Sequence, residues 1–376
     1  MLDFYEFFSG GGMARIGLGQ GWRCLFANDM DEKKAAAYKA NFNGAPELKV
    51  CDVAALSPAD LPGAADLAWA SFPCQDLSLA GNRGGLAAER SGAFWPFWRL
   101  MQGLMAENRA PRLIALENVC GALTSHDGKD FLAIAEAFAH AGYRFGAVVI
   151  DAAHFLPHSR PRLFIIGARA DLEIPRRLKT VAPDSVFHPP TVRERVKQLP
   201  FKTRRRWIWW RIPRPPARKA VFADLIENAP QGVEWHTPAE TRRLLGLMSE
   251  VNRAKVSMAQ AAGRRTVGGV YKRTRNGEQR AEVRFDDVAG CLRTPVGGSS
   301  RQTILIVDGP YIRSRLLSPR EAARLMGLPE SYELPDRYNE AYHIAGDGLA
   351  VPVVRHLATN LFEAMLSSGD RLAAVG

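Results

Sequence analysis

The first 170 residues alternate between short apolar runs and helix-like stretches, and this alternation constrains the fold more than any other feature of the chain. Pieces such as EKKAAAYKANF (32–42) and DFLAIAEAFAHAG (130–142) carry apolar residues at helical spacing. The apolar runs predict strands at 3–8, 23–28, 48–52, 66–72, 113–119, 147–152 and 162–168. This pattern predicts an α/β fold with a doubly wound, mostly parallel sheet and helices on both faces. Functional residues are then expected at the carboxyl ends of the strands, where such sheets bind ligands.

The alternation stops near residue 172, where prolines punctuate a stretch with a different pattern. Residues 176–300 hold 26 Lys+Arg and 11 Asp+Glu, whereas the whole chain holds 50 and 39 and has a net charge of +11. This concentration favours a polyanion-binding module, with a solvated basic surface as the alternative. We therefore predict a first domain at 1–175, a smaller basic domain at 176–330, and a C-terminal segment at 331–376 that returns to the first domain.

Cysteine usage and hydropathy indicate where the protein works. The composition, with 47% hydrophobic and 24% charged residues, is typical of a globular protein. There is no run of about 18 apolar residues that would predict a membrane span. The cysteines form no CxxC or Cys/His cluster, which favours reduced thiols over a zinc site or a disulfide framework. They are Cys24, Cys51, Cys74, Cys120 and Cys291. We expect a cytoplasmic protein with no metal and no membrane contact.

Glycines follow the first predicted strand in FFSGGGM (7–13) and precede a helix. Glycines at such a turn let the backbone approach a ligand closely. Asp29 stands at the end of the second predicted strand, where an acidic residue typically binds a ribose diol. Asp52 ends the third strand and could accept a hydrogen bond from an adenine amino group. A cofactor that contains a nucleoside is indicated, and NAD and S-adenosylmethionine fit this pattern equally well.

Three chemically distinct side chains follow further strands. Cys74 comes after the strand at 66–72 and is either a small core residue or a rigidly held nucleophile. Glu117 lies at the next strand end, and Arg160 and Arg162 stand two residues apart, so that both could point to one side. A thiol, a carboxyl and a guanidinium that converge on one cleft would suit covalent attack on an electron-poor ring.

These motifs, taken in order, resemble those of the DNA (cytosine-5) methyltransferase family, and the resemblance extends from about residue 3 to about residue 365. It is highly specific because Pro-Cys-Gln is followed by Glu-Asn-Val and by paired arginines. The shared elements are Phe-Ser-Gly-Gly-Gly at 8–12, Asp29, Asp52, Pro-Cys-Gln at 73–75, Glu-Asn-Val at 117–119, His-Ser-Arg-Pro-Arg at 158–162, Arg-Leu-Leu-Ser-Pro-Arg-Glu at 315–321 and Gly-Asp-Gly at 346–348. Four positions depart from the family pattern. Ser71 stands where glycine often precedes the Phe, and Met13 stands where a further glycine is frequent. His158 replaces a usual Gln, and Asp347 replaces a common Asn.

The resemblance implies a Rossmann-like catalytic domain that binds S-adenosylmethionine, and a smaller domain that recognises the target. Cys74 would add to C6 of a flipped cytosine, Glu117 would contact N3 and the amino group, and Arg162 would hold O2. Arg160 would help to orient these catalytic groups. The implied cofactor residues are Phe8, Gly10, Gly12, Asp29, Asp52, Phe94, Asp347 and Leu349.

The implied partner is duplex DNA. A restriction endonuclease that acts separately is a further candidate partner, and we expect the chain itself to be a monomer. The stretch 76–85 resembles the family's DNA-closing loop; Ser78 lies within it, and Gln75 lies directly before it. Basic residues of the predicted smaller domain could neutralise phosphates or read guanine edges. They are Arg204, Arg205, Arg206, Arg211, Arg273 and Arg275. We expect the nearby Trp207, Trp209 and Trp210 to pack the smaller domain's core.

Three other functions stay open at this point. A relative with the same active site could methylate cytosine in tRNA, although the long basic segment favours duplex DNA. A DNA-binding repressor that has lost catalysis would leave the Cys74, Glu117 and Arg162 set without a role. A dinucleotide oxidoreductase fits the glycine turn alone and explains neither Pro-Cys-Gln nor the basic segment. The target sequence does not transfer from the family.

Overall fold

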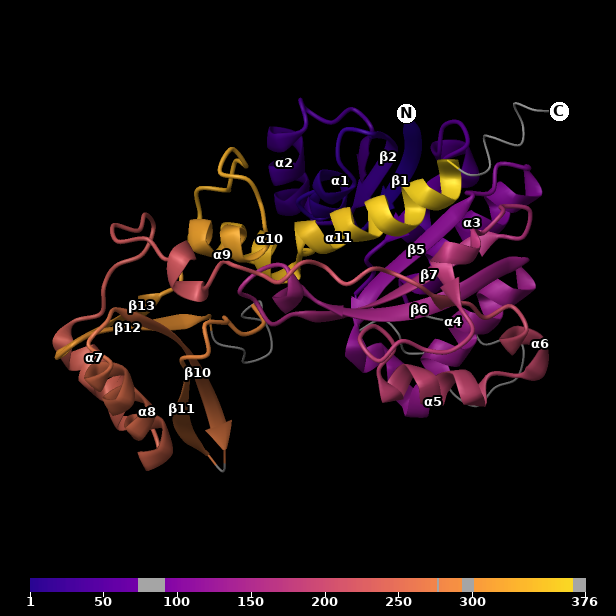
Figure 1. The fold of residues 1–376 in the computed structure, drawn as a ribbon. Coiled ribbons are helices and arrows are strands. Elements are labelled where there is room, and N and C mark those ends of the chain that lie inside the picture. The colour runs from indigo at the N-terminus through magenta and orange to yellow at the C-terminus, as the bar shows by residue number, and fades with distance from the viewer. Residues whose placement is uncertain (74–91, 276, 293–300, 368–376) are drawn as a thin grey trace. The chain divides into compact units, whose positions relative to one another are not determined.

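The structure is a computed structural model that describes residues 1–73, 92–275, 277–292 and 301–367. Its chain forms two compact units (Figure 1). Unit 1 comprises Met1–Asp151, Pro161–Arg214 and Val353–Gly376, and unit 2 comprises Ala152–Arg160 and Pro215–Pro352.

Unit 1 is built on a seven-stranded sheet of order β3-β2-β1-β4-β5-β7-β6. The strands are β1 (Leu2–Phe7), β2 (Trp22–Asp29), β3 (Leu48–Val50), β4 (Leu67–Ala70), β5 (Leu113–Val119), β6 (Tyr143–Asp151) and β7 (Pro161–Arg169). All pairs are parallel except those that β7 makes with β5 and β6. The predicted doubly wound, mostly parallel sheet is therefore confirmed. The strand order reverses between β1 and β4, which is where sheets of this type bind ligands.

Helices cover both faces of this sheet, and β4 shows how the two faces divide. Ala68 and Ala70 belong to the core cluster that includes residues of α3 and α4, whereas Trp69 packs against Phe362 of the C-terminal helix at 6.4 Å between ring centroids. The C-terminal helix crosses the strands in yellow in Figure 1. The helices of unit 1 are α1 (Met13–Leu18), α2 (Glu32–Asn41), α3 (Phe94–Ala106), α4 (Lys129–His140), α5 (Pro190–Gln198), α6 (Phe201–Arg204) and the C-terminal α11 (Val351–Leu357), which continues into a π-helical turn at Ala358–Phe362 and begins in unit 2.

The structural boundary between the units follows Arg214, whereas the sequence places it after residue 175. The difference arises because residues 176–214 extend the edge of the unit 1 sheet. The backbone N–H of Phe145 on β6 donates to the carbonyl of Arg206 at 3.0 Å, and Ile208 N–H donates to the carbonyl of Phe145 at 2.7 Å. The backbone N–H and C=O groups of Phe145 at the edge strand β6 thus find hydrogen-bond partners in a segment that the sequence analysis assigned to the smaller domain.

The three neighbouring tryptophans also pack in unit 1, so the expectation that they form the smaller domain's core is wrong. Trp210 is fully buried and donates its indole N–H to the carbonyl of Ile166 at 3.3 Å. Trp207 meets the ring of Phe145 edge-on at 5.5 Å, and Trp209 lies 5.3 Å from Trp207. These rings pin residues 176–214 to the sheet.

Unit 2 contains a four-stranded antiparallel sheet of order β11-β10-β12-β13. Its strands are β10 (Thr266–Arg275), β11 (Glu278–Arg284), β12 (Thr303–Asp308) and β13 (Tyr311–Leu316), and its complete helices are α7 (Pro238–Gly246), α8 (Glu250–Ala261), α9 (Pro319–Leu325) and α10 (Tyr338–Asp347). Leu244 and Val256 from the helices pack against Val270 and Leu305 of the sheet. Among all described residues of both units, no helix is long and apolar enough to span a bilayer.

Candidate functional site

The glycine turn after β1 adopts backbone conformations that require small residues. Gly10 and Gly12 have φ of 54° and 77°, and Phe8 also has a positive φ of 57°. A Cβ on Gly12 would lie 2.2 Å from the ring of Phe42, so only glycine allows the turn to pack this closely against α2. The sequence predicted this turn, and the structure places it at the strand-order reversal.

Asp29 and Asp52 lie at the carboxyl ends of neighbouring strands, beside the glycine turn. One carboxylate oxygen of Asp29 accepts the N–H of Gly10 at 2.7 Å, and the other accepts the N–H of Asp31 at 2.9 Å. Asp52 is exposed and accepts the N–H of Ala54 at 2.8 Å. Each carboxylate oxygen has a further lone pair. The two acids therefore hold the local backbone and can still accept hydrogen bonds from a ligand.

A buried carboxyl supports the glycine turn from β1, and sequence reasoning missed it. Glu6 accepts the backbone N–H of Arg15 in the first turn of α1 at 3.3 Å and the hydroxyl of Tyr38 at 3.1 Å. The helix N-cap, Gly12, has no side chain to do this, so Glu6 acts in its place. Burial raises the pKa of Glu6 to about 7, against the opposing effects of Tyr38 and Arg15. A lone acid inside an apolar strand was the only sequence signal.

Aromatic rings connect the glycine turn to the end of β4. Phe72 lies 6.5 Å from Phe8 and 5.7 Å from Phe94, measured between ring centroids. Phe94 begins α3, is buried, and stacks on Trp98 at 5.6 Å. The predicted cofactor residues Phe8 and Phe94 thus belong to one aromatic cluster, in which Phe94 forms part of the core.

Asn118 fixes the chain just before the predicted nucleophile. Its amide donates to the carbonyl of Phe72 at 3.0 Å, and its oxygen accepts the N–H of Val119 at 2.8 Å. Pro73 follows Phe72, and Cys74, Gln75 and Ser78 come next in the chain but lie outside the described residues. The prediction for these three residues therefore stays a prediction, while their attachment point is firmly held.

Glu117 and Arg162 form an ion pair at the carboxyl end of β5. Arg162 Nε lies 3.1 Å from Glu117 Oε1. The Glu117 side chain is 10% exposed and the Arg162 side chain 15% exposed. The antiparallel register, which pairs Val119 with Arg162, brings the two residues together. A cavity of about 10 Å³, the space of about one water molecule, adjoins Glu117, Asn118 and Phe72. A carboxyl and a guanidinium are thus held side by side, with little solvent, next to the end of β4.

Arg160 has a different environment from Arg162, although the two stand two residues apart. Arg160 is in unit 2 and buried, and it donates to the carbonyls of Gly346 at 2.9 Å and Gly348 at 2.7 Å. The two arginines therefore have separate partners, since Arg162 pairs with Glu117 and Arg160 binds carbonyls at the C-terminal end of α10. The predicted role of Arg160 in orienting the catalytic groups stays a prediction. Asp347, the last residue of α10, is exposed and Leu349 is buried, and their cofactor role stays a prediction.

His158, one of the departures from the family pattern, is fully buried and hydrogen-bonded at both ring nitrogens. Leu292 N–H donates to Nε2 at 3.2 Å, so Nδ1 carries the proton and donates to the carbonyl of Leu325 at 3.0 Å. A neutral ring bridges two backbone segments of unit 2 in this way, which explains how the site tolerates a histidine.

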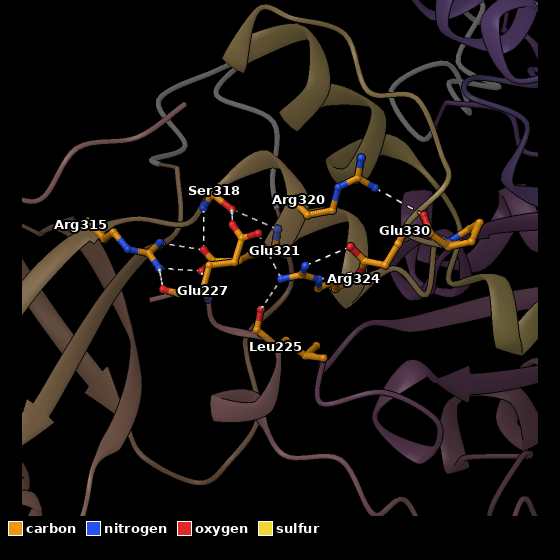
Figure 2. A network of polar contacts seen from close by, with 9 residues as sticks. Leu225, Glu227, Arg315, Ser318, Arg320, Glu321, Arg324 and Glu330 are labelled. Carbon is orange, nitrogen blue, oxygen red and sulfur yellow. Dashed lines mark hydrogen bonds and ion pairs between the residues drawn. The ribbon is translucent and has the colours of Figure 1, made fainter. Parts of the chain in front are cut away.

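The Arg-Leu-Leu-Ser-Pro-Arg-Glu motif builds a buried polar network in unit 2 (Figure 2). Arg315 donates to both carboxylate oxygens of Glu321, at 2.7 and 2.6 Å, and both side chains are fully buried. Glu321 also accepts the N–H of Glu227 at 2.7 Å, and Ser318 donates its hydroxyl to Glu227 at 2.8 Å. Ser318 also caps α9, since its hydroxyl accepts the N–H of Glu321 at 3.1 Å.

The residues predicted to contact DNA fall into both units. Arg204, Arg205, Arg206 and Arg211 lie in unit 1, and Arg273 and Arg275 lie in unit 2. Arg273 is exposed on β10 and pairs with Glu282 at 3.5 Å. Arg275 is the last residue of β10. The set is therefore divided between the two units, and its contact with DNA stays a prediction.

Metal chemistry has no support from the arrangement of side chains that the structure describes. Within residues 1–73, 92–275, 277–292 and 301–367, no group of three or more His, Cys, Asp or Glu side chains could hold a metal ion.

Comparisons with known proteins agree on one family. The family model of the C-5 cytosine-specific DNA methylases matches residues 2–363. Type II methyltransferase M.NlaX of Neisseria lactamica is 26% identical over 99% of this chain and 99% of its own length. Type II methyltransferase M.HhaI of Haemophilus parahaemolyticus is 23% identical over 96% of this chain and 94% of its own. The crystal structure of S. pombe Dnmt2 methyltransferase shares the fold, with a TM-score of 0.60, 18% identity, and coverage of 97% and 99% of the two chains.

Proposed function

Because the chain belongs to the C-5 cytosine-specific DNA methylases and is a DNA (cytosine-5) methyltransferase, we propose that it acts through a covalent bond between Cys74 and C6 of a flipped cytosine. The methyl donor would be S-adenosylmethionine, and the substrate a short specific sequence in duplex DNA. The Glu117–Arg162 pair carries this proposal, since it lies beside the end of β4 that leads to Cys74.

The cofactor fits the glycine edge of unit 1. Gly10 and Gly12 leave room beside the backbone of the turn because they have no side chains. Asp29 would accept hydrogen bonds from the ribose hydroxyls, and Asp52 one from the adenine amino group. The aromatic cluster of Phe8 and Phe94 would border the methionine end. When bound, the sulfonium supplies an electrophilic methyl group.

The residues at the ends of β4, β5 and β7 would do the remaining chemistry. The Cys74 thiolate forms a bond to C6, and the electron pair of the C5–C6 double bond makes C5 nucleophilic toward the methyl group. Protonated Glu117 donates to N3, while Arg162 holds O2. Loss of the C5 proton to solvent then expels the Cys74 thiolate and restores the ring. The ion pair in the free enzyme would give way to these contacts with the base.

The physical demand on Cys74 is that its sulfur reach one atom of the ring at the correct angle. Asn118 and Pro73 support this, because Asn118 ties down the carbonyl of Phe72 and the proline limits the backbone that follows. Such positioning contributes to catalysis by pre-organising the attack.

Similarity to Type II methyltransferases supports a modification role alongside a restriction endonuclease, which we propose as a separate protein that acts on the same DNA sequence.

Sequencing of 5-methylcytosine at single-base resolution, in DNA from cells that express the chain, tests the proposal. We expect methylation at one short motif, none with Cys74→Ala, and wild-type levels with the control Cys120→Ala, whose thiol has a pKa raised by burial. Methylation that survives Cys74→Ala would contradict the covalent route. Methyl transfer to RNA with none to DNA would contradict the proposed substrate.

A further inference from the structure

The most basic stretch of this protein belongs to unit 1, which carries the candidate site. Residues 176–214 hold 12 Lys+Arg and two Asp+Glu, and all of them belong to unit 1. Its net charge is +10, whereas the rest of unit 1 has a net charge of −4 and unit 2 one of +5. The sequence alone assigned this charge to the smaller domain.

Part of the charge gathers at the junction of α5 and α6, which we call the α5–α6 patch and define as Lys197, Lys202, Arg204 and Arg205. All four side chains are exposed. Of these four side chains, only Lys197 has a carboxylate partner within the described residues. That partner is Glu194, which is also exposed and lies 3.2 Å away. Four cations with so little internal compensation favour an anionic partner.

An exposed aromatic ring lies within the same patch. Phe201, the first residue of α6, is 67% exposed, and the guanidinium of Arg205 lies 6.0 Å from its ring centre. Arg204 reaches the carbonyl of Lys197 at 3.5 Å, which joins the two helices. Basic groups interleaved with an aromatic ring are typical of nucleic-acid surfaces.

The helices that carry the patch are fixed to the rest of unit 1 by hydrogen bonds and an aromatic contact, which distinguishes the patch from a solvated run of charges. Arg195 of α5 donates to the carbonyls of Leu123 at 2.7 Å and Asp127 at 2.9 Å. Its guanidinium fills the space beside Gly128, where a Cβ would lie 2.4 Å from it. Trp207, just after α6, meets Phe131 of α4 at 6.2 Å between ring centroids.

These anchors connect the patch to the edge of the sheet that carries Glu117. The chain leaves β5 at Val119, makes two 3₁₀ turns at Cys120–Leu123 and Ser125–Gly128, and begins α4 at Lys129. Arg195 holds carbonyls in both turns, and Figure 1 shows α5 and α6 beside α4. The patch is therefore attached to the loops at the carboxyl edge of the sheet, where the reacting base would lie.

We propose that the α5–α6 patch binds backbone phosphates of the DNA duplex that flanks the target cytosine. The inference rests on the proposed function, since DNA is taken as the substrate. A duplex carries one charge per about 1.7 Å of its axis, so a rigid group of cations can neutralise several phosphates. The contact carries no sequence information and would add affinity on long DNA.

The test compares wild-type enzyme with the triple variant Lys202→Gln/Arg204→Gln/Arg205→Gln. Fluorescence anisotropy measures DNA affinity against salt, on a duplex that just contains the methylated motif and on one extended at both ends. Each lost phosphate contact reduces the slope of log K against log salt by about 0.9, so we expect a slope shallower by about 2 to 3 on the extended duplex. On the short duplex, which lacks the flanking phosphates, the slope of the triple variant should equal that of the wild-type enzyme.

A matched variant, Arg176→Gln/Arg177→Gln/Lys179→Gln, removes the same charge from exposed residues elsewhere in unit 1. An equal loss of slope in this control would overturn the proposal, because the effect would then be one of net charge. An unchanged slope in the patch variant, or a loss confined to an RNA hairpin, would overturn it too. A wild-type enzyme that methylates neither duplex would instead refute the proposed function.

Discussion

Replacement of Glu6 by Gln should make the stability of unit 1 less dependent on pH. Glu6 is 1% exposed and accepts hydrogen bonds from Arg15 N–H and the Tyr38 hydroxyl. Gln keeps one acceptor oxygen for Arg15, and its amide can donate to Tyr38, whose hydroxyl also accepts. The charged groups that face this position are Arg15 on α1 and Asp29 on β2, and both remain in the variant.

The magnitude follows from the pKa of Glu6, which rises from 4.5 to about 7 on folding. Between these two pH values the folded protein keeps a proton that the unfolded chain has lost, so the free energy of unfolding falls as pH rises. A shift of this size corresponds to about 3 kcal/mol, present in full below pH 4.5 and lost above pH 7. Glu6→Gln has no proton to lose and should avoid this loss.

Urea unfolding of wild type and Glu6→Gln, followed between about pH 5 and pH 8, measures the difference. We expect the free energy of unfolding of the variant to increase relative to that of the wild type as the pH rises. At about pH 8 the variant should be at least as stable as the wild type. Glu173→Gln makes the same chemical change at an exposed carboxyl and should keep the wild-type profile. Identical pH profiles for wild type and Glu6→Gln would refute this reasoning.

Two further substitutions test other features of the fold and site. Glu321→Ala leaves Arg315 buried without its partner and should lower the free energy of unfolding by about 3 to 5 kcal/mol, against less than about 1 kcal/mol for the exposed Glu330→Ala. Equal losses in urea unfolding would contradict the importance of burial. Gly12→Ala places a methyl group against Phe42 at a positive φ, and calorimetry should show S-adenosylhomocysteine binding weakened by about five- to thirtyfold, since strain of about 1 to 2 kcal/mol corresponds to that range. Gly10→Ala has open space and should lose less, so a larger loss there would contradict the steric argument.

The sequence predicted the edge of the sheet where functional residues gather, because strand ends can be read from apolar runs. Glu117 and Arg162 are the best case, since both follow from strand positions and the register then brings them into contact. Arg160 could not be assigned in this way, because its partners are carbonyls at Gly346 and Gly348, far along the chain. Contacts of that kind depend on tertiary packing.

The segment 176–214 illustrates a second limit of the sequence. The sequence shows its charge and its tryptophans, but it does not show which strand of the sheet the segment pairs with. Phe145 and Ile166 offer the backbone groups and the surface that receive it, and neither has a local signal of that role. A count of charges along the chain therefore assigned to the smaller domain a basic segment that packs in unit 1.

The division of unit 1 into three chain segments has a consequence for synthesis. Trp69 is synthesised before unit 2, whereas Phe362, which packs against it, follows only after unit 2. Arg112 likewise awaits the carbonyl of Leu366. The apolar face of β4 is thus exposed while the whole of unit 2 is being translated, which is a period of exposure to chaperones and to aggregation. An enzyme truncated before Val353 would never complete its catalytic unit.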